Sequence, residues 1–120
     1  MKLLTFLGFL LVSSSTLFAQ EIDERLLSRY SREDLQAMIK TDVDQYNVLD
    51  YALDNALYVA NYDGSKGDEF TLISVDVNSL PTYLDLNLHI TDQNQYYRIE
   101  GQDKLLVVKS TWVLMHEMKK

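Results

Sequence analysis

The most apolar stretch of the chain is at its start. Leu3 to Val12 is almost wholly apolar, and Lys2 places a positive charge before it. Serine and threonine residues then lead to Ala19, a small residue of the kind found at signal-peptide cleavage sites. The apolar run has about ten residues, half of the roughly 20 that a membrane-spanning helix needs. The pattern predicts a cleaved secretory signal peptide over residues 1–19, followed by a single globular domain over residues 20–120.

Two helices are expected in the first half of this domain. Ser31 precedes Glu33 and Asp34, which is typical of a helix start, because a serine hydroxyl accepts from amides of the first turn and acids are favoured there. A second helix is expected to begin at Thr41 or Asp42 and to end between residues 57 and 61. Its apolar residues recur at steps of three and four. They are Tyr46, Leu49, Leu53, Ala56 and Leu57.

From residue 70 onward the apolar period changes to two, which predicts strands over residues 70–77, 84–90, 96–100 and 104–109. The last two form a predicted hairpin. Residues 110–120 are interpreted as a further strand, with a helix capped by Ser110 as the alternative. Helices followed by strands indicate an α+β domain. We expect two N-terminal helices packed on a small antiparallel sheet of about four strands.

Charge and cysteine content narrow the function classes. The formal charge is −7, and removal of the predicted signal leaves 10 basic and 18 acidic residues. An acidic surface repels phosphates, so we expect no nucleic-acid partner. No other stretch approaches the length of a membrane span, so after cleavage we expect no insertion into a membrane. The chain has no cysteine, which excludes disulfides, thiol nucleophiles and thiolate zinc sites. No cofactor signature is present, and the expected location is the periplasm or the extracellular space.

One candidate for catalysis lies in the predicted strand 84–90. Asp85 and His89 share its polar face and could act as the acid and base of a small hydrolase. Four strand residues span about 13 Å, so a group from another element would have to complete the site. The alternative interpretation is the solvated face of a half-buried sheet.

A calcium site is the second candidate. Asp63, Asp68 and Glu69 surround two glycines, and calcium binds six to eight oxygen ligands. The spacing differs from that of an EF-hand, and a solvated turn explains the same residues.

The third candidate is aromatic, since the chain has eight tyrosines. Five of them could line a surface for a small ligand or another envelope protein. They are Tyr46, Tyr51, Tyr58, Tyr62 and Tyr83. Core packing is the alternative. Because no catalytic motif is found, the sequence favours a non-covalent binding module of the cell envelope, with the hydrolase and a calcium-stabilised domain as alternatives.

Two segments near the C-terminus, residues 86–101 and 103–114, resemble small exported proteins of Bacteroidota-type bacteria. The resemblance implies export and no particular activity.

Overall fold

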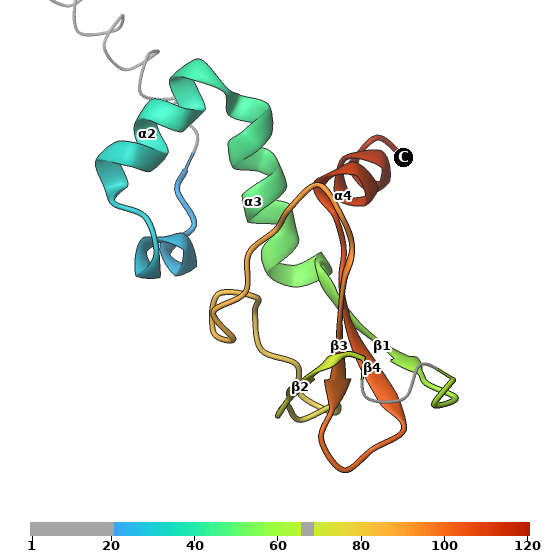
Figure 1. Ribbon diagram of the computed structural model, residues 1–120. Coiled ribbons are helices and arrows are strands. Elements are labelled where there is room, and N and C mark those ends of the chain that lie inside the picture. Colours follow the sequence, from blue (N-terminus) through green and yellow to red (C-terminus); the bar gives the residue numbers. More distant parts are fainter. Residues whose placement is uncertain (1–20, 66–68) are drawn as a thin grey trace, which may run out of the picture.

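The computed structural model describes residues 21–65 and 69–120, so the predicted signal peptide lies outside the described residues. Its helical elements are η1 (Glu24–Ser28, a 3-10 helix), α2 (Arg32–Thr41), α3 (Val43–Asn55) and α4 (Thr111–Met118). Its strands are β1 (Leu57–Asn61), β2 (Thr71–Ile73), β3 (Gln95–Ile99) and β4 (Lys104–Val108). Figure 1 shows helices α2 and α3 preceding the sheet, and α4 following it.

The four strands form one sheet in the order β1-β4-β3-β2. The β1–β4 and β3–β4 pairs are antiparallel, whereas β2 and β3 run parallel. The expected α+β class, with two helices ahead of a sheet of four strands, is therefore confirmed, but the sheet is mixed. The long connection over residues 74–94 explains the parallel pair, because parallel neighbours need a crossover rather than a tight turn.

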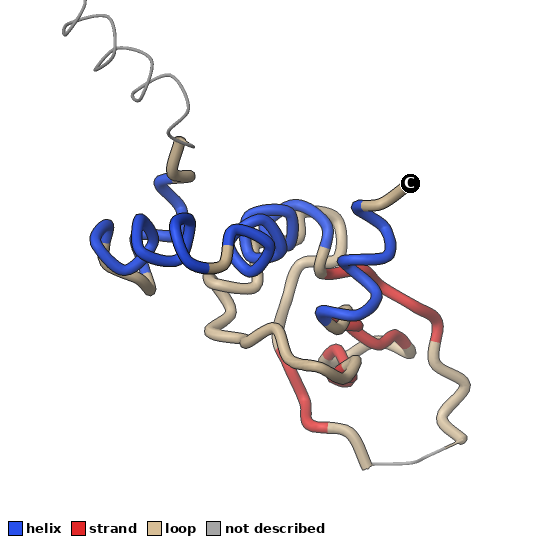
Figure 2. The backbone as a smooth tube through the Cα atoms, turned by 90° about the horizontal axis from the view of Figure 1, so that it is seen from above, coloured by secondary structure: helices blue, strands red, loops and turns tan. Residues whose placement is uncertain are grey.

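The main core lies between one face of this sheet and the helices α3 and α4. Leu106 and Val108 of β4 are fully buried on that face, together with Leu114 of α4. From α3, Leu49 and Leu53 pack into the same cluster. Seen from above, α2 and α3 lie to one side of the strands, and α4, next to the C-terminus, overlaps the strands in this view (Figure 2). Among the described residues, no helix is long and apolar enough to span a bilayer.

Both predicted helix starts are confirmed by their caps. Ser31 Oγ accepts from the amide of Asp34 at 3.0 Å, and Asp42 Oδ1 accepts from the amide of Gln45 at 3.3 Å. Each side chain satisfies an amide that has no partner within its own helix. The local sequence therefore determines where α2 and α3 begin.

The end of α3 was predicted too late. The helix stops at Asn55, and residues 57–61 form β1 rather than a last helical turn. Leu57 continues the helical stripe of apolar residues, so periodicity alone extends the helix. Pairing with β4 decides the outcome, and the aromatic and β-branched side chains of Tyr58 and Val59 suit a strand.

The predicted strand over residues 84–90 is wrong. Residues 83–87 form a turn of helical type, in which the amide of Asp85 donates to Thr82 Oγ1 at 3.2 Å and Asp85 Oδ2 accepts from the amide of Thr82 at 3.1 Å. This is a reciprocal capping box. Asn87 ends the turn at a φ of 57°, in the left-handed region that asparagine tolerates. The alternating leucines fit both structures, and the cap selects the helical one.

Two further predicted strands differ from the structure. The predicted strand 70–77 is reduced to the three residues of β2. Residues 111–118 form helix α4 instead of the favoured strand, and Ser110 Oγ accepts from the amide of Val113 at 3.2 Å, as the alternative proposed. The predicted hairpin is confirmed as β3 and β4, with Gly101 in its turn at a φ of 74°.

Candidate functional site: the outer sheet face

The face of the sheet turned away from α3 and α4 carries most of the exposed aromatic side chains. Sheet pairing places Tyr58, Val107 and Tyr96 in one row across β1, β4 and β3. We call this surface the outer sheet face. It is formed by Tyr58, Ala60, Tyr62, Phe70, Leu72, Tyr96, Arg98, Leu105 and Val107.

Three of its residues are large, apolar and exposed. The exposed fractions are 45% for Tyr58, 60% for Leu72 and 43% for Tyr96. Each comes from a different strand, namely β1, β2 and β3. Isolated exposed apolar residues are common on protein surfaces, but several gathered on one face are typical of a binding surface.

Aromatic rings cover the centre of the outer sheet face. The Tyr62 and Phe70 rings meet edge to face with centroids 5.6 Å apart, and Phe70 lies 6.1 Å from Tyr96. The Arg98 guanidinium carbon is 5.3 Å from the centroid of the Tyr62 ring, within the range of a cation–π contact. Beneath these groups Val107 is only 2% exposed. The rings therefore form a packed layer whose outer side meets solvent.

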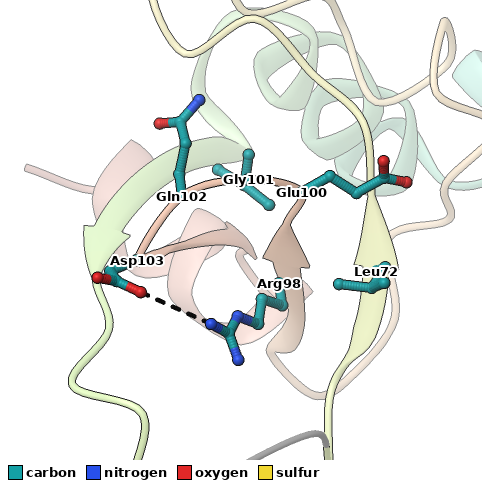
Figure 3. A pocket seen from close by; sticks show the side chains of 7 residues that line it. Leu72, Arg98, Glu100, Gly101, Gln102 and Asp103 are labelled. Atoms are coloured by element: carbon teal, nitrogen blue, oxygen red, sulfur yellow. Dashed lines mark ion pairs between the residues drawn. The ribbon is translucent and has the colours of Figure 1, made fainter.

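A shallow hollow of about 570 Å³ lies at the end of the β3–β4 hairpin, beside Leu72. Figure 3 shows Arg98 reaching toward Asp103 across this hollow; an Arg98 guanidinium nitrogen and an Asp103 carboxylate oxygen are 3.6 Å apart. Glu100 and Gln102 project from the turn above it. The hollow gives the outer sheet face an apolar side at Leu72 and a polar rim at the turn.

The five tyrosines proposed from the sequence differ in burial. Tyr46, Tyr62 and Tyr83 are buried, and Tyr46 and Tyr83 belong to the main core. Tyr51 is half-buried, and Tyr58 is exposed. Tyr46 and Tyr83 therefore pack in the core, as the alternative interpretation held, while Tyr58 and Tyr62 lie on the outer sheet face.

Hydrogen bonds explain why the core tyrosines can be buried. The Tyr46 hydroxyl accepts from the amide of Asp23 at 3.0 Å and donates to the carbonyl of Glu21 at 3.2 Å. The Tyr83 hydroxyl donates to the carbonyl of Leu49 at 3.1 Å. Burial raises the pKa of Tyr83 above its usual range. These hydroxyls are structural, because their hydrogen-bonding capacity is used within the fold.

A chain of polar contacts joins Tyr58 to the helices. Lys109 Nζ lies 5.7 Å from the Tyr58 ring centroid and forms an ion pair with Glu117 at 2.8 Å. Glu117 also accepts from the Tyr51 hydroxyl at 3.0 Å. The nearby ammonium of Lys109 lowers the pKa of Glu117. The network therefore links Tyr58, whose ring is partly exposed, to α3 and α4.

The predicted catalytic pair is not assembled into a site. Asp85 and His89 are both exposed, and the carboxylate of Asp85 serves the cap described above. The backbone carbonyl of His89 accepts from Gln95 Nε2 at 2.6 Å. Within residues 21–65 and 69–120, no carboxylate or hydroxyl is hydrogen-bonded to the imidazole. The predicted pairing of His89 with an acid is therefore not found among the described residues.

Among the described residues, the predicted calcium ligands do not form a metal site. Asp63 Oδ1 accepts from the amide of Ser65 at 2.8 Å, and this bond lowers the pKa of Asp63. Glu69 is exposed, and Asp68 lies outside the described residues. In the described ranges no group of three or more acids and histidines could hold a metal ion. Asp63 belongs to an ordinary turn of the kind that aspartate commonly forms.

The sequence reasoning missed an acidic cluster near the N-terminus. Arg25 forms ion pairs of 2.9 Å with both Asp23 and Asp54. The guanidinium lowers the pKa of Asp23 to about 2. Asp50 differs, since burial and a hydrogen bond with the Asp23 carboxyl group raise its pKa. The cluster joins the start of the described chain to α3, and its residues are too far apart in sequence to be recognised as a motif.

It also missed most of the outer sheet face. Phe70, Leu72, Tyr96 and Arg98 were assigned to strands but not to a surface. Alternation within a strand could have grouped Phe70 with Leu72, and Tyr96 with Arg98, because alternate residues of one strand share a face. The order of strands, which no local pattern reveals, was needed to bring them together.

A second exposed aromatic residue lies apart from these strands. Trp112 on α4 is 75% exposed, and His116 follows it one turn later. Both line a shallow hollow of about 600 Å³ with Glu117 and Lys120. No other described aromatic ring is in contact with Trp112, whereas the rings of the outer sheet face pack on one another.

Comparison with protein-family models, with curated proteins and with solved structures returns no match.

Proposed function

We propose that this protein is a non-covalent binding module of the cell envelope, and that it docks an apolar region of another protein on the outer sheet face. One observation carries the proposal. Tyr58, Leu72 and Tyr96 are exposed together on the face of the sheet that the helices leave uncovered. Envelope location is supported by the predicted signal peptide, and the resemblance to small exported proteins agrees with it.

The composition of the outer sheet face favours a protein partner. Protein interfaces are enriched in tyrosine, phenylalanine and arginine, and their binding energy is concentrated in a few such residues at the centre. Here the centre consists of the rings of Tyr62, Phe70 and Tyr96, with Arg98 stacked at one end. The charged groups lie at the margin, where Asp103 and Glu117 neutralise Arg98 and Lys109. A partner with an apolar centre fits this arrangement better than a highly charged one.

The packing of the rings supports binding without large rearrangement. Val107 and Leu105 are buried beneath them, so the tyrosine and phenylalanine side chains already occupy fixed positions. Aromatic side chains held in place lose little conformational entropy on binding, which increases affinity.

The test uses envelope extract from cells that produce the protein. The full chain is expressed, purified and used as bait beside two variants, one with Tyr58→Ser, Leu72→Ser and Tyr96→Ser, and a control with Trp112→Ser. We expect a partner that wild type and the Trp112 variant retain and that the triple variant loses, with at least about tenfold weaker binding by calorimetry once the partner is purified.

All substituted side chains are exposed, so the melting temperatures should stay close together, which is checked by circular dichroism. A partner that the triple variant still binds, or that only the Trp112 variant loses, would remove the outer sheet face from the binding site. A protein that recovers no partner would contradict the proposed function itself.

A further inference from the structure

Strand β1 has one unpaired edge. Among the described residues it lies at the margin of the sheet and pairs only with β4 (Figure 1). The amide of Lys109 donates to the carbonyl of Ala56 at 2.9 Å, and the amide of Tyr62 donates to the carbonyl of Asp103 at 3.0 Å. In an antiparallel pair every second residue is hydrogen-bonded to the partner, so the intervening Tyr58 and Ala60 also bond to β4.

It follows that the other residues of β1 direct their backbone groups away from the sheet. Leu57, Val59 and Asn61 present their N–H and C=O groups along the free edge. Within residues 21–65 and 69–120, no strand or loop backbone is hydrogen-bonded to this side of β1. The free edge therefore offers donors and acceptors to another strand.

The sequence of β1 does nothing to prevent such pairing. Natural edge strands are usually protected by a charge, a proline, a bulge or shortness. The other edge strand, β2, is only three residues long. In contrast, β1 has five residues, Leu-Tyr-Val-Ala-Asn, with no charge and no proline. An edge of this kind either pairs in the native protein or leads to aggregation.

The same five residues are self-complementary when two copies are placed antiparallel. A two-fold axis at Val59 pairs all five residues of both strands and sets the outward backbone groups of Leu57 against those of Asn61 from the second copy. On the outer sheet face it sets Tyr58 beside Ala60, so that a large ring meets a small side chain. No charged side chain of β1 opposes the contact, although the chain as a whole has a charge of −7.

The geometry points to β1 as a self-association edge: two copies of this chain pair their β1 strands antiparallel about Val59. The two sheets become one of eight strands, and their outer sheet faces become continuous across the axis. This inference does not depend on the proposed function, because it concerns the edge of the sheet and a second copy, not the partner docked on its face.

Charge substitutions on β1 test the register. The full chain is expressed, and the purified protein is analysed by sedimentation velocity over a range of concentrations. Wild type is expected to be a dimer. The variant with Tyr58→Lys and Ala60→Lys places lysine against lysine twice across the axis, and we expect its dimerisation to weaken by about tenfold or more.

The matched variant combines Tyr58→Lys with Ala60→Glu. It shares the first substitution but places lysine against glutamate across the axis, so dimerisation should return toward the wild-type value. Circular dichroism and thermal melting establish that both variants are folded. A wild type that stays monomeric at high concentration, or two double variants with the same dissociation constant, would overturn the inference.

Cysteine cross-linking checks the axis by an independent readout. The chain has no cysteine, so a single introduced thiol reports one contact. Val59→Cys places two thiols opposite each other, and we expect a covalent dimer on mild oxidation. In Ala60→Cys the two Cα atoms would lie beyond the roughly 7 Å limit for a disulfide, so little dimer should form. The reverse result would exclude this register.

Discussion

Tyr58 of β1 and Tyr96 of β3 lie in one row across the sheet because both are paired with Val107 of β4. The two rings flank Val107, which is almost completely buried although it is on the face that the helices leave uncovered. The sheet therefore has two apolar sides of unequal depth. A deep core lies under the helices, and a thin layer of rings lies on the outer sheet face.

The first prediction compares adjacent leucines on these two sides. Leu106 points into the main core and is fully buried, whereas Leu105 lies under the rings and is 9% exposed. We expect Leu106→Ala to lower the free energy of unfolding by about 3–5 kcal/mol, and Leu105→Ala by about 2 kcal/mol, because the thin layer can collapse or admit water. Urea unfolding measures both, and equal losses would contradict the two-sided description.

The second prediction concerns the Tyr46 hydroxyl, which bonds to the backbone of Glu21 and Asp23. Tyr46→Phe leaves these part-buried groups without their partner, so we expect a loss of about 1–3 kcal/mol. Hydrogen exchange should also become faster at the amides of residues 23–28. Tyr51→Phe is the control, since its half-buried hydroxyl bonds to the Glu117 side chain, and it should cost less. A larger effect at Tyr51 would show that the N-terminal segment is held by other contacts.

Local signals in the sequence were sufficient for the helix starts and the hairpin. Ser31 and Asp42 cap their helices through bonds that span three residues, and the turn at Gly101 joins strands that are adjacent in the chain. Interactions over such short separations depend only on residues that are close together in the sequence. They could therefore be recognised without knowledge of the remaining fold.

The errors occurred where one pattern fits two structures. Leu84 and Leu88 are four residues apart, so they share a face both in a strand and in a helical turn. The capping box between Thr82 and Asp85 favours the helical turn. Leu57 similarly fits both the end of α3 and the start of β1. Its assignment depends on pairing with Val108, far along the chain.

The candidate site could be predicted only in part for the same reason. Tyr58 and Tyr62 were named as surface candidates, but they meet Phe70 and Tyr96 only through the strand order β1-β4-β3-β2. The burial of Tyr46 and Tyr83 depends on carbonyl and amide groups of distant segments. Composition correctly indicated tyrosine as the residue type of the site. Which tyrosines lie on the outer sheet face depends on the tertiary structure.

The third prediction separates two aspartates of α3 by pH. The pKa of Asp54 is lowered by Arg25, so the stability it contributes is present above its ordinary value of 3.8 and is lost as the pH falls below that value. The pKa of Asp50 is raised by burial and by Asp23, so its contribution is full below pH 3.8 and is lost as the pH rises through the raised pKa.

At pH 7, Asp50→Asn should therefore stabilise the protein, because it removes a partly buried charge beside Asp23. Asp54→Asn should destabilise it by about 0.2–1 kcal/mol, the usual value of an exposed ion pair. Near pH 3 both effects should shrink. Thermal melting of the two variants at pH 3 and pH 7 provides the measurement, and a loss of stability in Asp50→Asn at pH 7 would refute the assigned direction.

The last prediction compares two serine caps that differ in burial. Ser31 Oγ accepts from Asp34 at 3.0 Å at the exposed start of α2, and Ser110 Oγ accepts from Val113 at 3.2 Å at the start of α4. Ser110 is only 4% exposed. When its hydroxyl is removed, water cannot easily replace it at the Val113 amide. We expect Ser110→Ala to cost about 1–2 kcal/mol and Ser31→Ala about 0.5–1 kcal/mol.

Ser110 also connects α4 to the sheet, since its own amide donates to Asn94 Oδ1 at 2.8 Å, just before β3 begins. Ser110→Thr keeps a hydroxyl at the cap and should recover part of the lost stability, which separates the cap from this backbone contact. Urea unfolding of the three variants gives the order. If Ser110→Ala lowered the free energy of unfolding by no more than Ser31→Ala, the buried cap would not be what holds α4 against the core. The bond from the Ser110 amide to Asn94 would then have to hold α4 in place.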